Sequence, residues 1–242
     1  MYNKRQKEII RYLSEIKYVK TERLAQMFQV SLETIRRDLK EMEKEGLVKR
    51  VRGGVIYSSL RAKELEFSKK MENNQQGKYA IANLAMEYIH DGDAIAMNNG
   101  ITTLALAKCL QYERNGLTVV TNSPDIALLL SDKEQNQVFL TCGRLRKHNK
   151  SLTGGMCSES LDFFKVDKTI LSIDGISIED GVTEYNTEEA SVLRKMLGIG
   201  HTRMILCEYG KFSEVAFNKV CNADKIDYVF TDCSLPQKDM KA

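Results

Sequence analysis

A short break in helical periodicity near the N-terminus constrains this chain more than any other feature of its sequence. Apolar residues recur every three or four positions on both sides of the break, which is the spacing of amphipathic helices. The spacing predicts helices over residues 3–17 and 22–28 and a third that begins near Leu32. Thr21 and Ser31 are placed to cap the second and third helices. Two helices joined by a three-residue break predict a helix-turn-helix.

This motif spans about residues 20–39, and its second helix carries the candidate chemistry. The apolar stripe predicted to be buried consists of Leu32, Ile35, Leu39 and Met42, and Gly46 is placed to end the helix. At about 100° per residue, Arg37 and Lys40 point away from this stripe, while Arg36 and Asp38 flank it. Arginine can bond bidentately to guanine or grip phosphate oxygens. We expect Asp38 to hold an arginine in place, and Thr34 to lie where such a helix meets base edges.

A basic hairpin is predicted directly after the third helix. Two β-prone runs, residues 47–52 and 55–57, flank a Gly-Gly turn, and the first run carries three positive charges and no negative one. The pattern is that of a winged helix-turn-helix whose wing lies on the phosphate backbone. The candidate DNA contacts are Ser31, Thr34, Arg36, Arg37, Lys40, Lys49, Arg50 and Arg52.

The charge distribution agrees with a DNA-binding head. The chain has 36 Lys and Arg against 33 Asp and Glu, a net charge of +3. Residues 1–60 hold 14 basic and 8 acidic residues (+6), so the rest holds 22 and 25 (−3). A basic segment on an acidic body is expected of a nucleic-acid-binding module joined to another domain. Chance variation in charge along the chain is the alternative at this point.

Membrane, export, metal and disulfide classes are not favoured. The longest apolar run that we find, Ile126–Leu130, is far too short for a transmembrane span, and the charged start leads into no apolar signal segment. The six cysteines lie far apart with no C-x-x-C pair, which predicts free thiols in a reducing compartment and no metal site. We therefore expect a soluble cytoplasmic protein without a cofactor.

The larger part of the chain alternates between predicted strands and helices. Residues 58–77 are predicted to be a linker with a helix around 62–71, and a second domain runs over 78–242. Helices are expected over 78–89, 102–110, 124–130 and 188–197, and strands over 94–97, 117–121, 137–141, 169–173, 204–207 and 228–231. This alternation predicts an α/β domain with a largely parallel sheet.

Polar segments follow five of these strands. Ligands of such sheets gather beyond the carboxyl ends of the strands, and helix N-termini there attract anions. Each segment alone is more often a cap or turn than a ligand contact, but five together favour a binding site. The segments are 98–103, 122–124, 142–144, 174–175 and 208–212.

These motifs together resemble the DeoR family of bacterial transcription regulators. The strings VSLETIRRDL (30–39) and EGLVKRVRGG (45–54) look like the recognition helix and wing of that family. Segments around Gly100, Asn122, Glu189, Lys211 and Asp232 look like its sensor domain, which is similar in fold to ribose-phosphate isomerases and coenzyme A transferases. The resemblance implies a phosphorylated sugar or related metabolite as effector.

The resemblance also assigns effector residues. The complete candidate set is Asn99, Gly100, Thr102, Thr103, Asn122, Ser123, Gly143, Asp174, Gly175, Glu189 and Lys211. Gly100, Thr102, Thr103, Asn122 and Ser123 would cradle the phosphate with help from Lys211, and Asp174 and Glu189 would face sugar hydroxyls. The sequence departs from the family pattern at several positions, namely Asn98 or Asn99, Ile101, Cys142, Glu208 and Gly210. These departures bear on which effector is bound.

The leading interpretation is a repressor of carbohydrate-metabolism genes that a phosphorylated sugar releases from operator DNA. One winged helix reads few base pairs, so a homo-oligomer, dimer or tetramer, is expected. The alternative is a sugar-phosphate isomerase-like enzyme that uses Asp174, Glu189 and Lys211 as an acid/base set. The Lys-Gly-Gly-Gly segment of ribose-phosphate isomerases is missing, which argues against it. A pure interaction scaffold is the third class.

Overall fold

The computed structural model describes residues 3–16, 18–44, 47–51, 53–57, 74–147 and 149–232. The chain divides into two compact units, Met1–Met71 and Glu72–Ala242. Gly46, Arg52 and the helix predicted around 62–71 lie outside the described residues.

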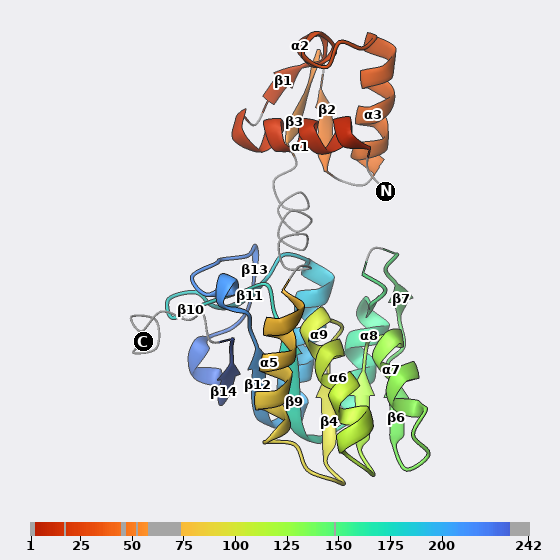
Figure 1. The fold of residues 1–242 in the computed structure, drawn as a ribbon, viewed down its shortest axis with the longest axis vertical. Helices are drawn as coiled ribbons and strands as arrows, with labels where there is room; N and C mark the ends of the chain where they lie inside the picture. The colour runs from red at the N-terminus through yellow and green to blue at the C-terminus, as the bar shows by residue number, and fades with distance from the viewer. Residues whose placement is uncertain are drawn as a thin grey trace. The chain divides into compact units, whose positions relative to one another are not determined.

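The first unit is a winged helix-turn-helix (Figure 1). Its elements are α1 (Lys4–Ile16), β1 (Tyr18–Lys20), α2 (Thr21–Met27), α3 (Leu32–Lys44), β2 (Val48–Val51) and β3 (Gly54–Tyr57). The sheet order is β1-β3-β2, and both pairings are antiparallel. Ile35, Leu39 and Met42 of α3 are buried in one core with apolar residues of α1, α2 and the sheet. The hairpin thus packs beside the recognition helix, as its sequence predicts.

Three details of this unit differ from the sequence prediction. Leu32 was expected in the buried stripe but is exposed, because it opens α3 before the helix reaches the core. Thr21 is the first residue of α2 and not its cap; Lys20 holds the cap position and makes no side-chain capping bond. Strand β1 was not predicted, since its three residues pair with β3 through tertiary contact and carry no strand-length pattern of their own.

The second unit is built on a six-stranded parallel sheet in the order β14-β12-β9-β4-β5-β6. The strands are β4 (Ala94–Met97), β5 (Thr118–Thr121), β6 (Gln137–Leu140), β9 (Val166–Ser172), β12 (Gly200–Leu206) and β14 (Tyr228–Phe230). The α/β class and the parallel sheet predicted from the alternation are therefore confirmed. Strands β9 and β12 begin earlier than predicted, because the first residues of each strand lack the apolar run that marks its buried second half.

Helices cover both faces of this sheet (Figure 1). One core contains apolar residues of α5 (Gln75–Met86), α6 (Ile101–Glu113) and α7 (Pro124–Ser131). The other contains residues of α8 (Gly155–Ser160), the 3-10 turn η1 (Leu161–Phe163) and α9 (Thr187–Ile199). Helix α5 begins at Gln75, three residues before the predicted start of the second domain.

Several short elements were not predicted. They are the hairpin of β7 (Arg144–Leu145) and β8 (Leu152–Thr153), the antiparallel sheet of β10 (Gly175–Ser177), β11 (Gly181–Glu184) and β13 (Asn218–Cys221), and the 3-10 turns η2 (Tyr209–Lys211) and η3 (Ala223–Lys225). Most of these elements have two or three residues, and the four-residue strands β11 and β13 lack the apolar run that marks β4 and β5. Strands β7 and β10 follow the carboxyl ends of β6 and β9, and η2 follows that of β12, so these elements lie beside the candidate effector residues.

Among the described residues, no helix is long and apolar enough to cross a membrane. The same part of the chain holds no cluster of His, Cys, Asp and Glu suited to a metal ion.

Candidate DNA and effector sites

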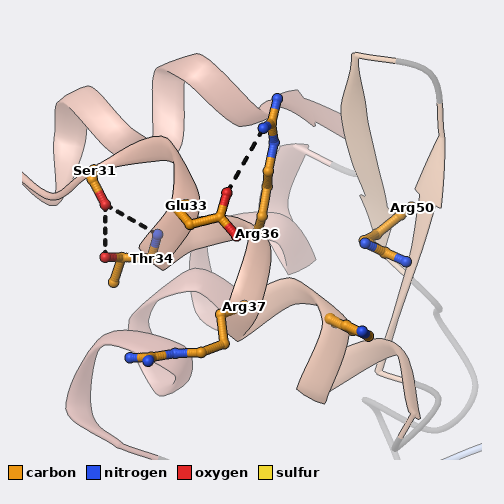
Figure 2. A pocket seen from close by; sticks show the side chains of 7 residues that line it. Ser31, Glu33, Thr34, Arg36, Arg37 and Arg50 are labelled. Carbon is orange, nitrogen blue, oxygen red and sulfur yellow. Dashed lines mark hydrogen bonds and ion pairs between the residues drawn. The ribbon is translucent and has the colours of Figure 1, made fainter.

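The start of the recognition helix α3 is fixed by two hydroxyl side chains. Ser31 Oγ accepts a hydrogen bond from Thr34 N at 3.2 Å and lies 2.8 Å from Thr34 Oγ1 (Figure 2). The cap predicted at Ser31 is therefore confirmed. Because both hydroxyls sit at the positive end of the helix dipole, this corner suits a phosphate or a base edge.

Basic side chains from the helix and the wing line one hollow. Its lining consists of Ser31, Glu33, Thr34, Arg36, Arg37, Lys40 and Arg50 (Figure 2). Arg36 is 62% exposed and reaches Glu33 only at 3.9 Å. Six of the eight predicted DNA contacts thus meet at one concave surface. Lys49 is exposed on β2 but is not part of this lining, and Arg52 lies outside the described residues.

A buried carboxylate fixes the recognition helix against α1. Asp38 is 2% exposed, and Arg5 Nε donates to its Oδ2 at 2.6 Å. Gln6 Nε2 donates to Oδ1 at 3.3 Å. The arginine that Asp38 is expected to hold is Arg5, from the first helix. Asp38 is therefore a positioning residue for the exposed arginines beside it.

The wing is joined to the recognition helix through Glu43. Arg50 N donates to Glu43 Oε1 at 2.8 Å, and Arg50 Nε donates to Glu43 Oε2 at 2.7 Å. Both bonds lower the pKa of Glu43 below its usual value, and the bond from the Arg50 backbone contributes more than the bond from the Arg50 side chain. The Arg50 side chain is 43% exposed and is held to Glu43 through Nε. Sequence analysis did not single out Glu43, because its partner lies seven residues away across a turn.

In the second unit, the ends of β4 and β5 meet in one polar network. Asn99 N donates to Asn122 Oδ1 at 2.8 Å, and Ser123 Oγ donates to Asn99 Oδ1 at 2.8 Å. Ser123 also caps α7 by accepting from Ile126 N. Three predicted effector residues are thus brought together, at the N-termini of two helices.

The start of α6 is closely packed against the end of β9. A Cβ atom on Gly100 would lie 2.6 Å from Ser172 Cβ, so only glycine fits there. Thr103 Oγ1 donates to Asn98 O at 2.8 Å, and Asn98 bonds both backbone groups of Ser172. Thr102 and Thr103 are both buried, whereas Ile101 between Gly100 and Thr102 is half exposed. The hydroxyl of Thr103 is already used as a donor inside the protein.

Glu189 is held by three donors from the β7–β8 hairpin. Its Oε1 accepts from Arg146 Nη1 at 2.7 Å, from Asn149 Nδ2 at 2.8 Å and, in a very short contact, from Ser151 Oγ. Asn99 Nδ2 in turn donates to Asn149 O at 2.9 Å. The resemblance implies that Glu189 faces a sugar, and in this structure its Oε1 also anchors the hairpin.

The base of the hairpin needs glycine at a predicted site residue. Gly143 has φ +125°, and a Cβ there would lie 2.7 Å from Thr153 O. Gly143 therefore lets the chain turn from β6 into the hairpin. The sequence gives no signal for Arg146, Asn149 and Ser151, because they lie in the connection between two strands of only two residues each.

A carboxyl pair lies at the end of β9. Asp174 Oδ2 accepts from Tyr185 N at 3.1 Å. Burial, followed by the neighbouring Asp174, raises the pKa of Glu184 well above its usual value. Burial and nearby carboxylates likewise raise the pKa of Tyr185 to about 12. The adjacent Gly175 passes Glu214 so closely that a Cβ would lie 2.3 Å from its carbonyl oxygen. The sequence predicts only Asp174 of this pair, because Asp174 follows the predicted strand 169–173, whereas Glu184 lies in the unpredicted strand β11.

Lys211 closes the carboxyl edge near β12. Its Nζ donates to Ile173 O at 2.6 Å. Beside it, Glu208 and Lys78 form a buried ion pair of 3.0 Å with both side chains 3% exposed. Glu208 Oε1 is buried and has no hydrogen-bond partner among the described residues. A buried acceptor without a donor is costly, so this edge of the sheet can accept a donor group from a ligand or water.

Two family models match this chain and together cover most of it. The model described as DeoR-like helix-turn-helix domain matches residues 5–60, and the model described as DeoR C terminal sensor domain matches residues 73–233. The boundary between the matches falls within the linker predicted over 58–77.

Curated relatives match along nearly their whole length. An HTH-type transcriptional repressor, GlcR, from Bacillus subtilis is 33% identical over 93% of this chain and 86% of that protein. The glycerol-3-phosphate regulon repressor of Escherichia coli is 29% identical over 96% of this chain and 92% of that protein. Among solved structures, ribose 5-phosphate isomerase A from Methanocaldococcus jannaschii aligns with a TM-score of 0.42 and 14% identity, over 58% of this chain and 55% of that one.

Proposed function

Because this chain belongs to the DeoR family of transcription regulators, we propose that it is a sequence-specific repressor of carbohydrate-metabolism genes, released from its operator by a phosphorylated sugar. The observation that carries the proposal is the single hollow in which side chains of α3 meet Arg50 of the wing. A basic concavity of this kind fits the edge of a duplex. The repressor would work in the cytoplasm.

We assign two kinds of contact to this surface. Arg37 and Lys40, on the outward face of α3, enter the major groove with Thr34 and the Ser31 hydroxyl at its start. Arg36, Lys49, Arg50 and Arg52 bind phosphate, which gives affinity without sequence preference and a steep dependence on salt.

We place the effector at the carboxyl edge of the parallel sheet. The Asn99, Asn122 and Ser123 network lies at two helix N-termini, where amide donors and the helix dipoles favour a phosphate. Gly100, Thr102, Thr103 and Lys211 complete that cradle, and Asp174 faces hydroxyl groups. The effector shifts the protein away from its DNA-binding form only if it binds the two forms with different affinity.

The DNA half of the proposal is tested by fluorescence anisotropy on duplexes from the region upstream of the gene. Wild-type protein should select one duplex over a scrambled duplex at moderate salt. Arg37→Ala should lose this selectivity, whereas Lys44→Ala, a basic residue of α3 outside the hollow, should keep it. Equal binding to both duplexes by the wild type would refute sequence-specific recognition.

The effector half is tested by thermal shift against a panel of sugar phosphates, because a bound ligand raises stability by mass action. A stabilising compound should also release the operator duplex. Compounds that stabilise but release nothing would contradict the regulatory role.

We also propose that the sensor unit has no isomerase activity. An acid/base set of Asp174, Glu189 and Lys211 needs free carboxylates, yet Glu189 Oε1 already accepts three hydrogen bonds. An aldose–ketose isomerisation assay on ribose 5-phosphate should give no turnover above buffer. Turnover that Asp174→Asn abolishes would overturn this proposal.

A further inference from the structure

Strand β6 forms one edge of the main sheet, and its outer side is open. Within the described residues it pairs only with β5. Gln137 N donates to Leu117 O and Thr141 N donates to Thr121 O, so alternate residues of this segment face β5. In a parallel pair, both backbone groups of the residues between them point the other way. The backbone N–H and C=O groups of Val138 and Leu140 therefore face outward.

This edge has none of the features that keep sheet edges apart. Strand β6 has the sequence QVFL, with no charge and no proline, and Phe139 and Leu140 are 43% and 46% exposed. The Phe139 ring lies 5.3 Å from the Phe164 ring. Elements next to the strand add exposed apolar side chains, namely Leu128 of α7 and Phe163 of η1. An uncharged, apolar strand edge predicts that another strand covers it.

The charges beside β6 favour a second copy of this chain as the partner. Asp132 and Glu134, both exposed, precede the strand, and the partly buried Lys133 between them donates to the backbone carbonyls of Gln111 and Arg114. Arg144 and Lys147 follow the strand and are exposed; Arg144 is paired with Glu188 at 2.7 Å, so Lys147 is the cation at this end that has no carboxylate partner among the described residues. Two copies of β6 in antiparallel orientation would place the acidic end of each next to the basic end of the other. Opposite charges across such an interface favour this orientation.

The opposite edge of the sheet lacks this complementarity. Strand β14 exposes Tyr228 and Val229; the exposed Asp224, Lys225 and Asp227 precede it, and Asp232, which follows it, is buried. Among the described residues no basic side chain follows β14, so antiparallel pairing of two β14 strands would not place a basic end of one copy beside an acidic end of the other. The two edges are alike in exposed apolar surface and differ in charge, which selects β6.

We propose that two copies of this chain dimerise by antiparallel pairing of their β6 strands about a two-fold axis at Phe139. In this register, Val138 faces Leu140 of the partner subunit, and the two residues exchange both backbone hydrogen bonds. The reciprocal pair does the same, as an isologous interface requires. Phe139 packs against the partner's Phe139, and one sheet runs through both copies. The inference rests on the proposed function only in that the regulator is taken to self-associate.

A cysteine placed at the axis tests both the face and the register. Residues in a non-hydrogen-bonded antiparallel pair have Cα atoms about 4.5 Å apart, within the range that a disulfide spans. The full-length Phe139→Cys variant, oxidised with oxidised glutathione, should therefore form a covalent dimer that reductant dissolves. Val229→Cys, on the opposite edge, is the matched control. Wild-type protein accounts for the six native cysteines.

Light scattering on the same samples makes each outcome decisive. A wild-type dimer with a crosslink at position 139 and not at 229 supports the proposal. A wild-type dimer that crosslinks only at 229, or at neither position, places the interface elsewhere. A monomer at micromolar concentration refutes the β6 interface. Sequence-selective DNA binding is measured separately, so its failure would leave this result standing.

A charge at the axis gives a second test that needs no oxidation. Phe139→Lys brings two ammonium groups together across the interface and should raise the dissociation constant of the dimer roughly tenfold or more. Tyr112→Lys, on the exposed face of α6, should leave it unchanged. Unchanged melting temperatures would show that both variants fold, and an unchanged dissociation constant for Phe139→Lys would overturn the proposal.

Discussion

The two candidate sites of this molecule use charged and polar side chains in opposite ways. In the hollow beside α3, the arginines are largely exposed, and Arg36 touches its nearest carboxylate only at 3.9 Å. At the carboxyl edge of the parallel sheet, polar side chains are buried and bonded to each other, as Glu189 is to Arg146. The first site leaves its charged side chains exposed to solvent. The second site uses its charged side chains in internal hydrogen bonds and ion pairs that fix the shape of the site.

This contrast shows that a residue type does not fix a residue's role. An exposed arginine costs little to keep ready, because water solvates it until a phosphate replaces the water. A buried carboxylate must be satisfied inside the protein, so each such group is tied to a partner before any ligand arrives. We therefore expect substitutions at the sheet edge to change stability first and substitutions in the hollow to change binding first.

The largest effect is expected from breaking the buried ion pair of Lys78 and Glu208. Lys78→Met leaves the Glu208 carboxylate buried without its cation, which costs about 3–5 kcal/mol of unfolding free energy. For a unit of this size the melting temperature should fall by roughly 10 °C. Urea denaturation followed by circular dichroism measures the loss.

The double variant Lys78→Met with Glu208→Gln is the control, because it buries no charge and should regain most of the stability. A loss below about 1 kcal/mol in the single variant would mean that this pair behaves like a surface pair. The contrast between the two regions would then fail.

The next largest effect is on binding and belongs to the hollow. Arg37→Ala should weaken operator binding by about 1–3 kcal/mol and relax the preference at one base position. Its unfolding free energy should stay within about 0.5 kcal/mol of wild type, because the side chain is exposed. Anisotropy titrations on single-base variants of the operator measure the first quantity. Equal weakening on every sequence would make Arg37 a phosphate contact and not a base reader.

The pH dependence of stability sharpens the contrast at the carboxyl pair. Burial raises the pKa of Glu184 above its unfolded value near 4.5, so its contribution is fully present below that pH. The contribution is lost as the pH rises toward the folded pKa, by about 1.4 kcal/mol per pH unit within this window. Glu184→Gln carries no such proton and should flatten the decline. Denaturation series from pH 4 upward test this, with the exposed Glu179→Gln as control; parallel curves for wild type and Glu184→Gln would refute it.

The sequence predicts the framework of the fold because that framework is periodic. The stripe of Ile35, Leu39 and Met42 and the apolar strand 94–97 signal a helix and a buried strand directly. Strand β1 and the β7–β8 hairpin could not be found in this way. Their strands are only two or three residues long, and β1 forms only by pairing with β3, which is distant in sequence.

The two candidate sites differ in the same way in how far the sequence predicts them. Six candidate DNA contacts could be predicted to lie together, because α3 and an adjacent hairpin position them, and the structure places all six in the lining of one hollow. At the sheet edge, the predicted strand ends place Asn99, Asn122 and Ser123 near one another, and the structure shows them hydrogen-bonded. The contacts of Glu189 could not be predicted, since they depend on Arg146, Asn149 and Ser151 from an unpredicted hairpin.

The smallest effect on stability is expected from breaking the ion pair of Glu43 and Arg50 beside the hollow. Glu43 and Arg50 have side chains 34% and 43% exposed and join at 2.7 Å, with geometry as good as that of Lys78 and Glu208. Water screens the exposed pair, so Glu43→Gln should cost at most about 1 kcal/mol of unfolding free energy at neutral pH. The lowered pKa of Glu43 means that this contribution is present above the unfolded pKa and fades as the pH falls through the folded one.

Binding should respond more clearly than folding to the same change. Without the Glu43 carboxylate, Arg50 is no longer fixed toward a phosphate, so Glu43→Gln should weaken binding alike on operator and scrambled duplexes. Glu41→Gln, two residues earlier on the same helix, is the control, because Glu41 accepts from Gln6 of α1 and makes no contact with Arg50. A stability loss as large as that of Lys78→Met would show that burial does not separate the two pairs, whereas weaker binding at nearly unchanged stability is what an exposed surface prepared for DNA requires.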